Sequence, residues 1–336
     1  MINDRIHYPN GWSRYGNVVY YNKHWQKPAN TEQTAFNYVL KSARSKPIQF
    51  LCFPWATLID LKNNNKYSDL LKELEYALLN LPPTFGLERV TFCQHIFSID
   101  LFPLFRKLQI KHVFWSHKTR GQNEHNKITI SPLPLVPVQF FSKYKTNDLN
   151  WHERKYLFNF LGSYDPKHYL NKTRMWIFKH LANDKRGYVV DKGLWHFQNM
   201  VYKEQIAGIK ESNAERKIRD ADEKDYVFAL ENSKFTLCPS GTGPNSIRFW
   251  EALEFGSIPV LISEQLDLGC IVASSRYLRV SERESSIVEL PKTLEHYCPK
   301  ITNSHSSIVM FDDFLRVTID KYVNRLNDTW GFGEIG

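Results

Sequence analysis

The stretch Ser233–Ser263, SKFTLCPSGTGPNSIRFWEALEFGSIPVLIS, decides the fold of this chain. It predicts a strand, a tight glycine turn, a short helix and a second strand, the layout of a phosphate-binding corner in an α/β sheet. Pro244 suits the first position of the helix, and Gly256 suits the left-handed residue that ends it. The apolar run Ile258–Ile262 is typical of a parallel strand that is covered on both faces.

The residues around this turn point to anion binding. Gly241 and Gly243 let backbone N–H groups approach an anion, and the helix that follows points its positive end the same way. Arg248 can make a charge-assisted contact to a phosphate, and Glu251 on the same helix face can accept hydrogen bonds from a ribose. The alternative is that the glycines only form a turn and that Arg248 and Glu251 form a surface ion pair. The residues of this corner expected to bind a nucleotide are Ser240, Gly241, Thr242, Gly243, Asn245, Ser246, Arg248 and Glu251.

The run CPSGTGPNSIRFWEALEFGSIPV closely resembles the signature of the exostosin-like glycosyltransferases. That signature has a Cys-Pro-x-Gly turn, a Ser-x-Arg-x-x-Glu-Ala helix and a Gly-x-Ile-Pro-Val strand. A weaker similarity lies at Arg154–Ser163, which looks like the first strand of the family's C-terminal domain, and Arg174 matches an arginine of the next helix. The resemblance implies a GT-B fold, in which two Rossmann-like, doubly wound α/β domains face a central cleft. It also implies a nucleotide-sugar donor held by the C-terminal domain, and inversion at the anomeric carbon without a bound metal.

Strands alternate with helices in both halves of the chain, and the proline-rich segment Pro132–Pro137 is a plausible connection between them. We therefore expect an N-terminal acceptor-side Rossmann-like domain over residues 1–140. A C-terminal nucleotide-sugar-binding domain is expected over residues 141–315, and a closing helix and tail over residues 316–336.

An inverting transfer needs a general base for the acceptor hydroxyl. Ligands of parallel α/β sheets meet the carboxyl ends of the strands, which directs attention to the residues that follow the N-terminal strands. His95 and His117 each lie at or just past the end of a predicted strand, and Asp100 and Asp60 are carboxylate options. The alternative for each histidine is a structural hydrogen bond.

One acidic motif would favour a metal-dependent mechanism instead. Asp220 and Asp222 form an Asp-x-Asp pattern, with which metal-dependent glycosyltransferases hold a divalent cation. Charged residues flank it on both sides, so it predicts a solvated helix junction. We expect no metal and no other cofactor.

Composition is that of a globular protein, with 42% hydrophobic residues among 336. A net charge of +9 suits an anionic substrate or an anionic membrane surface, but no nucleic-acid-binding signature is present. The five cysteines are scattered and odd in number, which indicates reduced thiols. With no signal peptide and no apolar run of membrane-spanning length, we expect a cytoplasmic location, with peripheral contact to the inner membrane face as an option.

Together these features predict an enzyme that moves a sugar from a nucleotide-sugar, taken as a UDP-sugar, to an oligosaccharide or a lipid-linked glycan. Its product would belong to a surface polysaccharide or another glycan. Two alternatives stay open: a nucleotide-sugar epimerase on the same fold, and a non-catalytic protein that binds polyanions or glycans.

Overall fold

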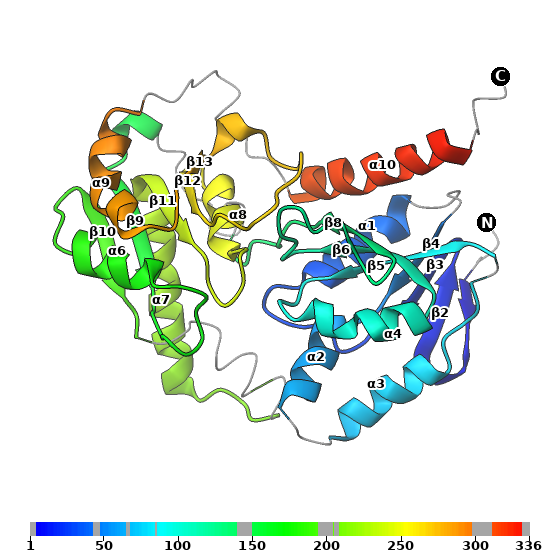
Figure 1. Ribbon diagram of the computed structural model, residues 1–336. Coiled ribbons are helices and arrows are strands. Elements are labelled where there is room, and N and C mark those ends of the chain that lie inside the picture. Colours follow the sequence, from blue (N-terminus) through cyan, green and yellow to red (C-terminus); the bar gives the residue numbers. More distant parts are fainter. Residues whose placement is uncertain are drawn as a thin grey trace. The chain divides into compact units, whose positions relative to one another are not determined.

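The computed structural model describes residues 5–42, 48–64, 68–84, 86–139, 150–193, 204, 208–297 and 311–330 (Figure 1). The chain forms two compact units. Unit 1 contains Met1–Pro134, Asp267–Ile271 and Phe311–Gly336, and unit 2 contains Leu135–Leu266 and Val272–Met310. The first boundary falls within the proline-rich segment, and the closing helix expected from the sequence belongs to unit 1.

Unit 2 is built on a sheet in which every strand pairs in parallel with its neighbours. The alternating pattern therefore predicted the α/β class of this unit correctly. In spatial order the strands are β10 (Gly187–Asp191), β9 (Tyr156–Gly162), β11 (Ser233–Pro239), β12 (Ile258–Ile262) and β13 (Leu278–Arg279).

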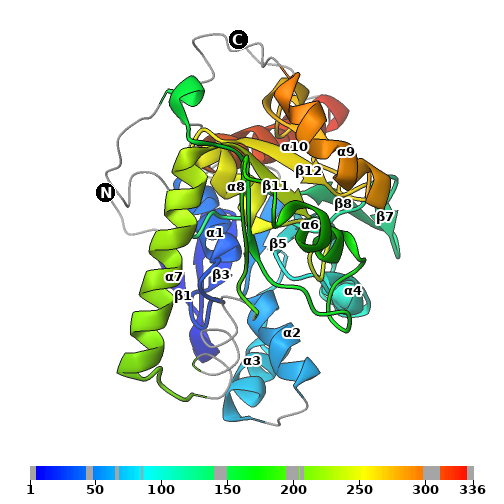
Figure 2. The ribbon, with the colours of Figure 1, turned by 90° about the vertical axis from the view of Figure 1, so that its left-hand side faces the viewer.

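Helices cover both faces of this sheet (Figures 1 and 2). Phe158 and Phe160 point to one face, where they pack with Ile177 and Leu290 of two helices. The opposite face carries a smaller apolar cluster that includes Leu230 and Phe255. The first face is covered by α6 (Thr173–Leu181) and α9 (Glu284–Glu295), and the second by α7 (Asn213–Asn232) and α8 (Ile247–Glu254).

Unit 1 contains a larger sheet with a parallel centre and antiparallel edges. The parallel centre agrees with the Rossmann-like domain expected for this half, whereas the antiparallel edges do not follow from that expectation. In spatial order they are β1 (Arg5–His7), β2 (Trp12–Tyr15), β3 (Val18–Tyr21), β4 (Ile48–Cys52), β5 (Glu88–Cys93), β6 (Ile110–Trp115), β8 (Ile128–Pro132) and β7 (Glu124–His125).

The helices of unit 1 follow the strands in an α/β order and lie on both sides of the sheet (Figure 1). The ring of Tyr322 on the C-terminal helix lies 3.8 Å from that of His112 on β6, which holds this helix on unit 1. The buried Lys118 forms an ion pair with Asp267, which ties Asp267–Ile271 to the same unit. The helices are α1 (Thr31–Ser42), α2 (Trp55–Asn63), α3 (Asp69–Leu79), α4 (Phe102–Lys107) and α10 (Phe311–Trp330).

The thiols of Cys52, Cys93 and Cys238 lie buried on strands and are unpaired, as expected, whereas Cys270 is exposed. Cys298 lies outside the described residues. Among the described residues, no helix combines the length and the apolar character that crossing a bilayer requires.

Arg154 holds the ends of two helices of unit 2 against the sheet. Its guanidinium donates to the carbonyls of Leu230 and Ser233 at 3.0 Å and to that of Phe255 at 2.6 Å. The next residue, Gly256, has φ of +63°, and a Cβ there would lie 3.2 Å from Arg154 Nη2. A glycine is needed here both for its backbone conformation and for the close approach of the guanidinium.

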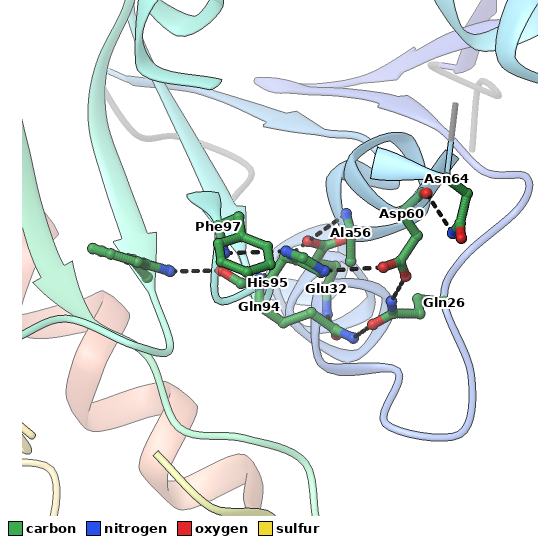
Figure 3. Close-up of polar contacts among 9 residues, drawn as sticks. Gln26, Glu32, Ala56, Asp60, Asn64, Gln94, His95 and Phe97 are labelled. Atoms are coloured by element: carbon green, nitrogen blue, oxygen red, sulfur yellow. Dashed lines mark hydrogen bonds and ion pairs between the residues drawn. The ribbon is translucent and has the colours of Figure 1, made fainter. Parts of the chain in front are cut away.

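Glu32 plays a comparable part in unit 1 (Figure 3). Its carboxylate lies at the start of α2, where it accepts the N–H of Ala56 at 3.2 Å, and it also accepts that of Gln94 at 3.0 Å. The side chain is almost fully buried, and burial raises its pKa from 4.5 to about 8. Glu32 therefore joins α1, α2 and the end of β5, at the cost of burying an ionisable group.

Replacing Arg154 by methionine should destabilise the protein strongly, because three buried carbonyls lose their donor. Each unsatisfied buried group costs about 1–3 kcal/mol, so a loss of at least about 3 kcal/mol is expected in urea unfolding. The control is Arg186→Met, which removes two surface ion pairs, with Asp184 and Glu295, and should cost about 1 kcal/mol or less. Equal losses in the two variants would contradict the role assigned to Arg154.

Replacing Glu32 by glutamine should flatten the pH dependence of stability. The folded protein keeps a proton on Glu32 that the unfolded chain releases, so this contribution is complete below about pH 4.5 and is lost as the pH rises to about 8. The thermal midpoint of the wild type should fall between pH 5 and pH 8 more steeply than that of Glu32→Gln. Glu124→Gln, at an exposed glutamate of the same unit, should follow the wild type.

Candidate functional site

The glycine corner of unit 2 forms as expected, except at the start of its helix. The helix α8 begins at Ile247, three residues later than Pro244, so the expected helix start was wrong. Ser246 precedes it in an extended conformation, and the buried side chain of Asn245 accepts a hydrogen bond from Trp250 Nε1 at 3.0 Å. This bond holds the chain in a loop up to the helix. Gly256, with its positive φ, ends the helix as predicted.

Two arginines meet at the carboxyl end of β9, around Gly162. A Cβ on Gly162 would lie 3.1 Å from Arg248 Nη2 and 3.4 Å from Arg174 Nη1, so both guanidinium groups pack closely against this glycine and a side chain here would crowd Arg248. Arg174 donates to the carbonyl of Ser240 at 3.0 Å, and Arg248 donates to that of Leu161. The residues that the sequence placed on two separate helices thus come together at one edge of the sheet.

Both guanidinium groups are held by neutral partners. In the described part of the chain, neither has a carboxylate oxygen within 4.0 Å, and Arg248 Nε is buried without a hydrogen-bond partner. The rings of Phe160, Tyr169 and Tyr226 lie against them, with the Arg174 guanidinium 4.3 Å from the Tyr169 centroid. Burial, and then the neighbouring Arg248, lower the pKa of Arg174 to about 10. The site therefore holds two guanidinium groups close together, Glu251 interacts electrostatically with Arg248, and an anion bound to both arginines would lower their mutual repulsion.

The loop after β11 is held by its own hydrogen bonds. The Gly241 N–H donates to the Gly243 carbonyl at 2.9 Å, and the Ser240 hydroxyl donates to Glu282. Thr242 is exposed and Ser246 is half-buried. Direct contacts of these residues with a phosphate stay a prediction, and the Gly241 amide would first have to leave its partner in the loop.

Glu251 lies deep in the structure and is only 3% exposed. One carboxylate oxygen accepts the N–H of Gln139 at 3.0 Å, and the other accepts the hydroxyl of Tyr226 at 2.6 Å. Burial raises its pKa. Glu251 thus joins α8, α7 and the start of unit 2, and its expected contact with a ribose stays a prediction.

The Asp-x-Asp pair lies within the helix α7. Asp222 pairs with Lys192 at 3.0 Å, and Asp220 pairs with Arg219 at 3.3 Å. In the described ranges, no three histidine, cysteine or acidic side chains gather as a metal site would require.

A second polar cluster lies at the carboxyl ends of β4 and β5 in unit 1 (Figure 3). His95 Nε2 lies 3.1 Å from Asp60 Oδ1, and Gln26 donates its amide to the other oxygen of Asp60. Gln94 in turn donates to Gln26 Oε1 at 2.6 Å. The structure therefore joins His95 and Asp60, which the sequence offered as separate candidates.

The other two candidate bases are placed differently. His117 is buried, and burial together with the neighbouring His95 lowers its pKa to about 3. Asp100 is exposed at a surface pocket of about 340 Å³, beside Lys62 and Lys107. Trp55, at the start of α2, is fully buried and donates to Thr91 Oγ1, which makes it a structural residue.

Several residues of both clusters were missed in the sequence. Tyr226, Tyr169 and Glu282 come from segments with no motif, and only the fold brings them to the arginines. Gln94 directly follows a strand, so the rule that nominated His95 applies to it as well. Gln26 follows no strand directly and had no comparable signal.

Comparison with known proteins identifies the family. The exostosin GT47 domain matches residues 111–294, which is more than half of the chain. Ribitol-5-phosphate xylosyltransferase 1 of Mus musculus is 36% identical over 112 residues, 32% of this chain and 20% of that protein. The Homo sapiens protein of the same name is 32% identical over 143 residues, 40% of this chain and 27% of that protein. Exostosin-1 of Drosophila melanogaster is 42% identical over 55 residues, 16% of this chain and 7% of that protein.

The chain thus spans about a quarter or less of the length of these relatives. Among solved structures, a GtfA/B complex is 10% identical with a TM-score of 0.37. The alignment covers 96% of this chain and 62% of that chain. The S. aureus MnaA–UDP co-structure is 12% identical with a TM-score of 0.38, over 80% of each chain. These two likenesses are too distant to say anything about function.

The match over residues 111–294 includes the whole glycine corner, which first suggested this family, and also Gly162 and Arg174 of the weaker similarity. The chain therefore belongs to the exostosin GT47 family of glycosyltransferases.

Proposed function

We propose that this glycosyltransferase takes its sugar from a nucleoside-diphosphate sugar, in the simplest case a UDP-sugar, and passes it to a hydroxyl group of a glycan. The observation that carries the proposal is the pair Arg174 and Arg248, which meet around Gly162 and, among the described residues, bond to backbone carbonyls and form no ion pair with a carboxylate. Two like charges held together at a strand end are electrostatically unfavourable unless an anion joins them. A diphosphate has the charge and the oxygen atoms that two guanidinium groups require.

In this proposal the arginines act mainly on the leaving group. When the bond between the anomeric carbon and the diphosphate breaks, its electron pair moves to the phosphate oxygen. Guanidinium groups that are already oriented by Leu161, Ser163 and Ser240 stabilise that charge without reorganising. Such preorganised charge supports transfer without a metal ion, since the positive charge that a cation would supply is already present.

Inversion at the anomeric carbon is part of the same proposal and is supported by the family resemblance. The acceptor, an oligosaccharide or a lipid-linked glycan of a surface polysaccharide, also stays a prediction. So do the cytoplasmic location, the peripheral contact with an anionic membrane, and the cleft between two facing domains.

Replacing either arginine of the pair by alanine should weaken the binding of UDP far more than that of uridine. Loss of one charge-assisted contact to a phosphate corresponds to about 10- to 100-fold in the dissociation constant. Isothermal titration with UDP, UMP and uridine measures the difference. Uridine should bind the variants and the wild type alike, because it has no phosphate.

Arg186→Ala is the control, because it also removes one arginine charge from unit 2. Arg186 is exposed and precedes β10, so it lies at the amino ends of the parallel strands, whereas the arginine pair lies at their carboxyl ends. Its affinity for UDP should stay within about twofold of the wild type. If the wild type binds no nucleoside diphosphate, the assignment of a nucleotide-sugar donor is contradicted. If Arg174→Ala and Arg248→Ala bind UDP as the wild type does, the arginine pair is not the diphosphate site.

Treatment with a chelator should leave the transfer rate unchanged. The enzyme is dialysed against EDTA and assayed with the donor and the acceptor, with and without added Mg²⁺ or Mn²⁺. Because Arg174 and Arg248 are expected to neutralise the leaving diphosphate, the rates should agree within about twofold. A rate that needs the cation would show that the arginine pair does not suffice.

A further inference from the structure

The polar cluster of unit 1 lies outside residues 111–294, the part of the chain that the GT47 domain matches. Its members come from a loop, a helix and a strand end: Gln26 precedes α1, Asp60 lies on α2, and His95 follows β5 (Figure 3). The carboxyl ends of parallel strands are where α/β sheets bind their ligands. This location, and not any motif, makes the cluster a candidate for chemistry on the acceptor.

The hydrogen bonds of His95 determine where its proton lies. The backbone N–H of Phe97 points at His95 Nδ1 from 3.1 Å. A backbone N–H can only donate, so Nδ1 must accept, and the ring proton of the neutral imidazole is on Nε2. Nε2 then donates this proton to Asp60 Oδ1 at 3.1 Å.

This arrangement leaves the imidazole without a lone pair for an acceptor hydroxyl. A general base must accept a proton, and the one accepting nitrogen of His95 already faces Phe97 N–H. Asp60 differs, because each carboxylate oxygen has two lone-pair sites and accepts one side-chain hydrogen bond, Oδ1 from His95 and Oδ2 from Gln26. Asp60 is therefore the member of the cluster that can still accept a hydrogen bond.

The surroundings place this carboxylate close to the surface. Its side chain is 5% exposed, that of His95 is 11% exposed, and Gln26 is half-buried. The ring of Phe97, 44% exposed, lies 5.5 Å from the imidazole. His117, the other histidine of this edge, is buried in surroundings that oppose its protonation.

We propose that Asp60 is the base that removes the proton from the acceptor hydroxyl, and that His95 and Gln26 are positioning residues that orient its carboxylate. The inference rests on the proposed inverting transfer. In that step the hydroxyl proton moves to Asp60, and the electron pair of the hydroxyl oxygen forms the new bond to the anomeric carbon. The bond from that carbon to the diphosphate breaks, and its electron pair leaves with the phosphate oxygen.

The test compares Asp60→Asn with His95→Gln. Glutamine can donate its amide N–H to Asp60 as Nε2 does, but it cannot accept a proton near neutral pH. His95→Gln should therefore keep kcat within about tenfold of the wild type, with the same acidic limb in its pH profile. Asp60→Asn should lose about 100- to 10,000-fold in kcat, the range for loss of a general base. Asp69→Asn, at an exposed aspartate of the same unit, is the matched control and should behave as the wild type.

A loss in His95→Gln as large as that in Asp60→Asn, together with loss of the acidic limb, would assign the base to His95 and overturn the proposal. Wild-type rates in Asp60→Asn would overturn it as well. A second variant, Asp60→Ala, covers the case in which the asparagine variant is misfolded. Formate should restore part of its rate if Asp60 is the base, and an absence of rescue in a protein with a wild-type thermal midpoint would contradict the proposal.

Titration with UDP keeps this inference separate from the donor assignment. If the proposed function fails, UDP does not bind even to the wild type. If only the role of Asp60 fails, UDP still binds the wild type and Asp60→Asn alike, and the rates of the variants give one of the contradicting results above.

Discussion

The contact on which the rest of unit 2 depends is the meeting of two guanidinium groups around Gly162. Like charges repel, so the fold must hold Arg174 and Arg248 in place with backbone carbonyls and aromatic faces. Gly162 lets both groups approach β9 closely, because a Cβ there would lie 3.1 Å from Arg248 Nη2. The strain that remains is electrostatic, and a bound anion would relieve it, which is why this edge of the sheet is suited to a diphosphate.

The two units share one organisation and differ in the chemistry of their strand ends. Unit 2 presents cations after β9 and β11, whereas unit 1 presents a carboxylate, an imidazole and two amides after β4 and β5. Positive charge suits a leaving group that gains electrons, and a carboxylate suits a hydroxyl that must lose a proton. If both proposals hold, the arginine pair of unit 2 acts on the leaving group and Asp60 of unit 1 acts on the acceptor hydroxyl.

Much of the α/β framework could be predicted because it follows local patterns. The apolar run Ile258–Ile262 marked β12, and the alternation of strands with helices indicated the α/β class. The misses have specific causes. The start of α8 was placed too early, because Asn245 binds Trp250 and keeps the preceding chain out of the helix. The helix α9 was not expected at all, and it contains Pro291, a residue that normally argues against a helix.

The sequence by itself determined the glycine corner, the family and the position of Arg248, because all of them lie within one continuous segment where local spacing is informative. Only the tertiary structure decided which groups are free to act. The bond from Phe97 to His95, the burial of Glu251 and the pairing of Arg174 with Arg248 join residues that come from different elements or depend on side-chain direction. Protonation and charge depend on such neighbours in space, and sequence order does not record them.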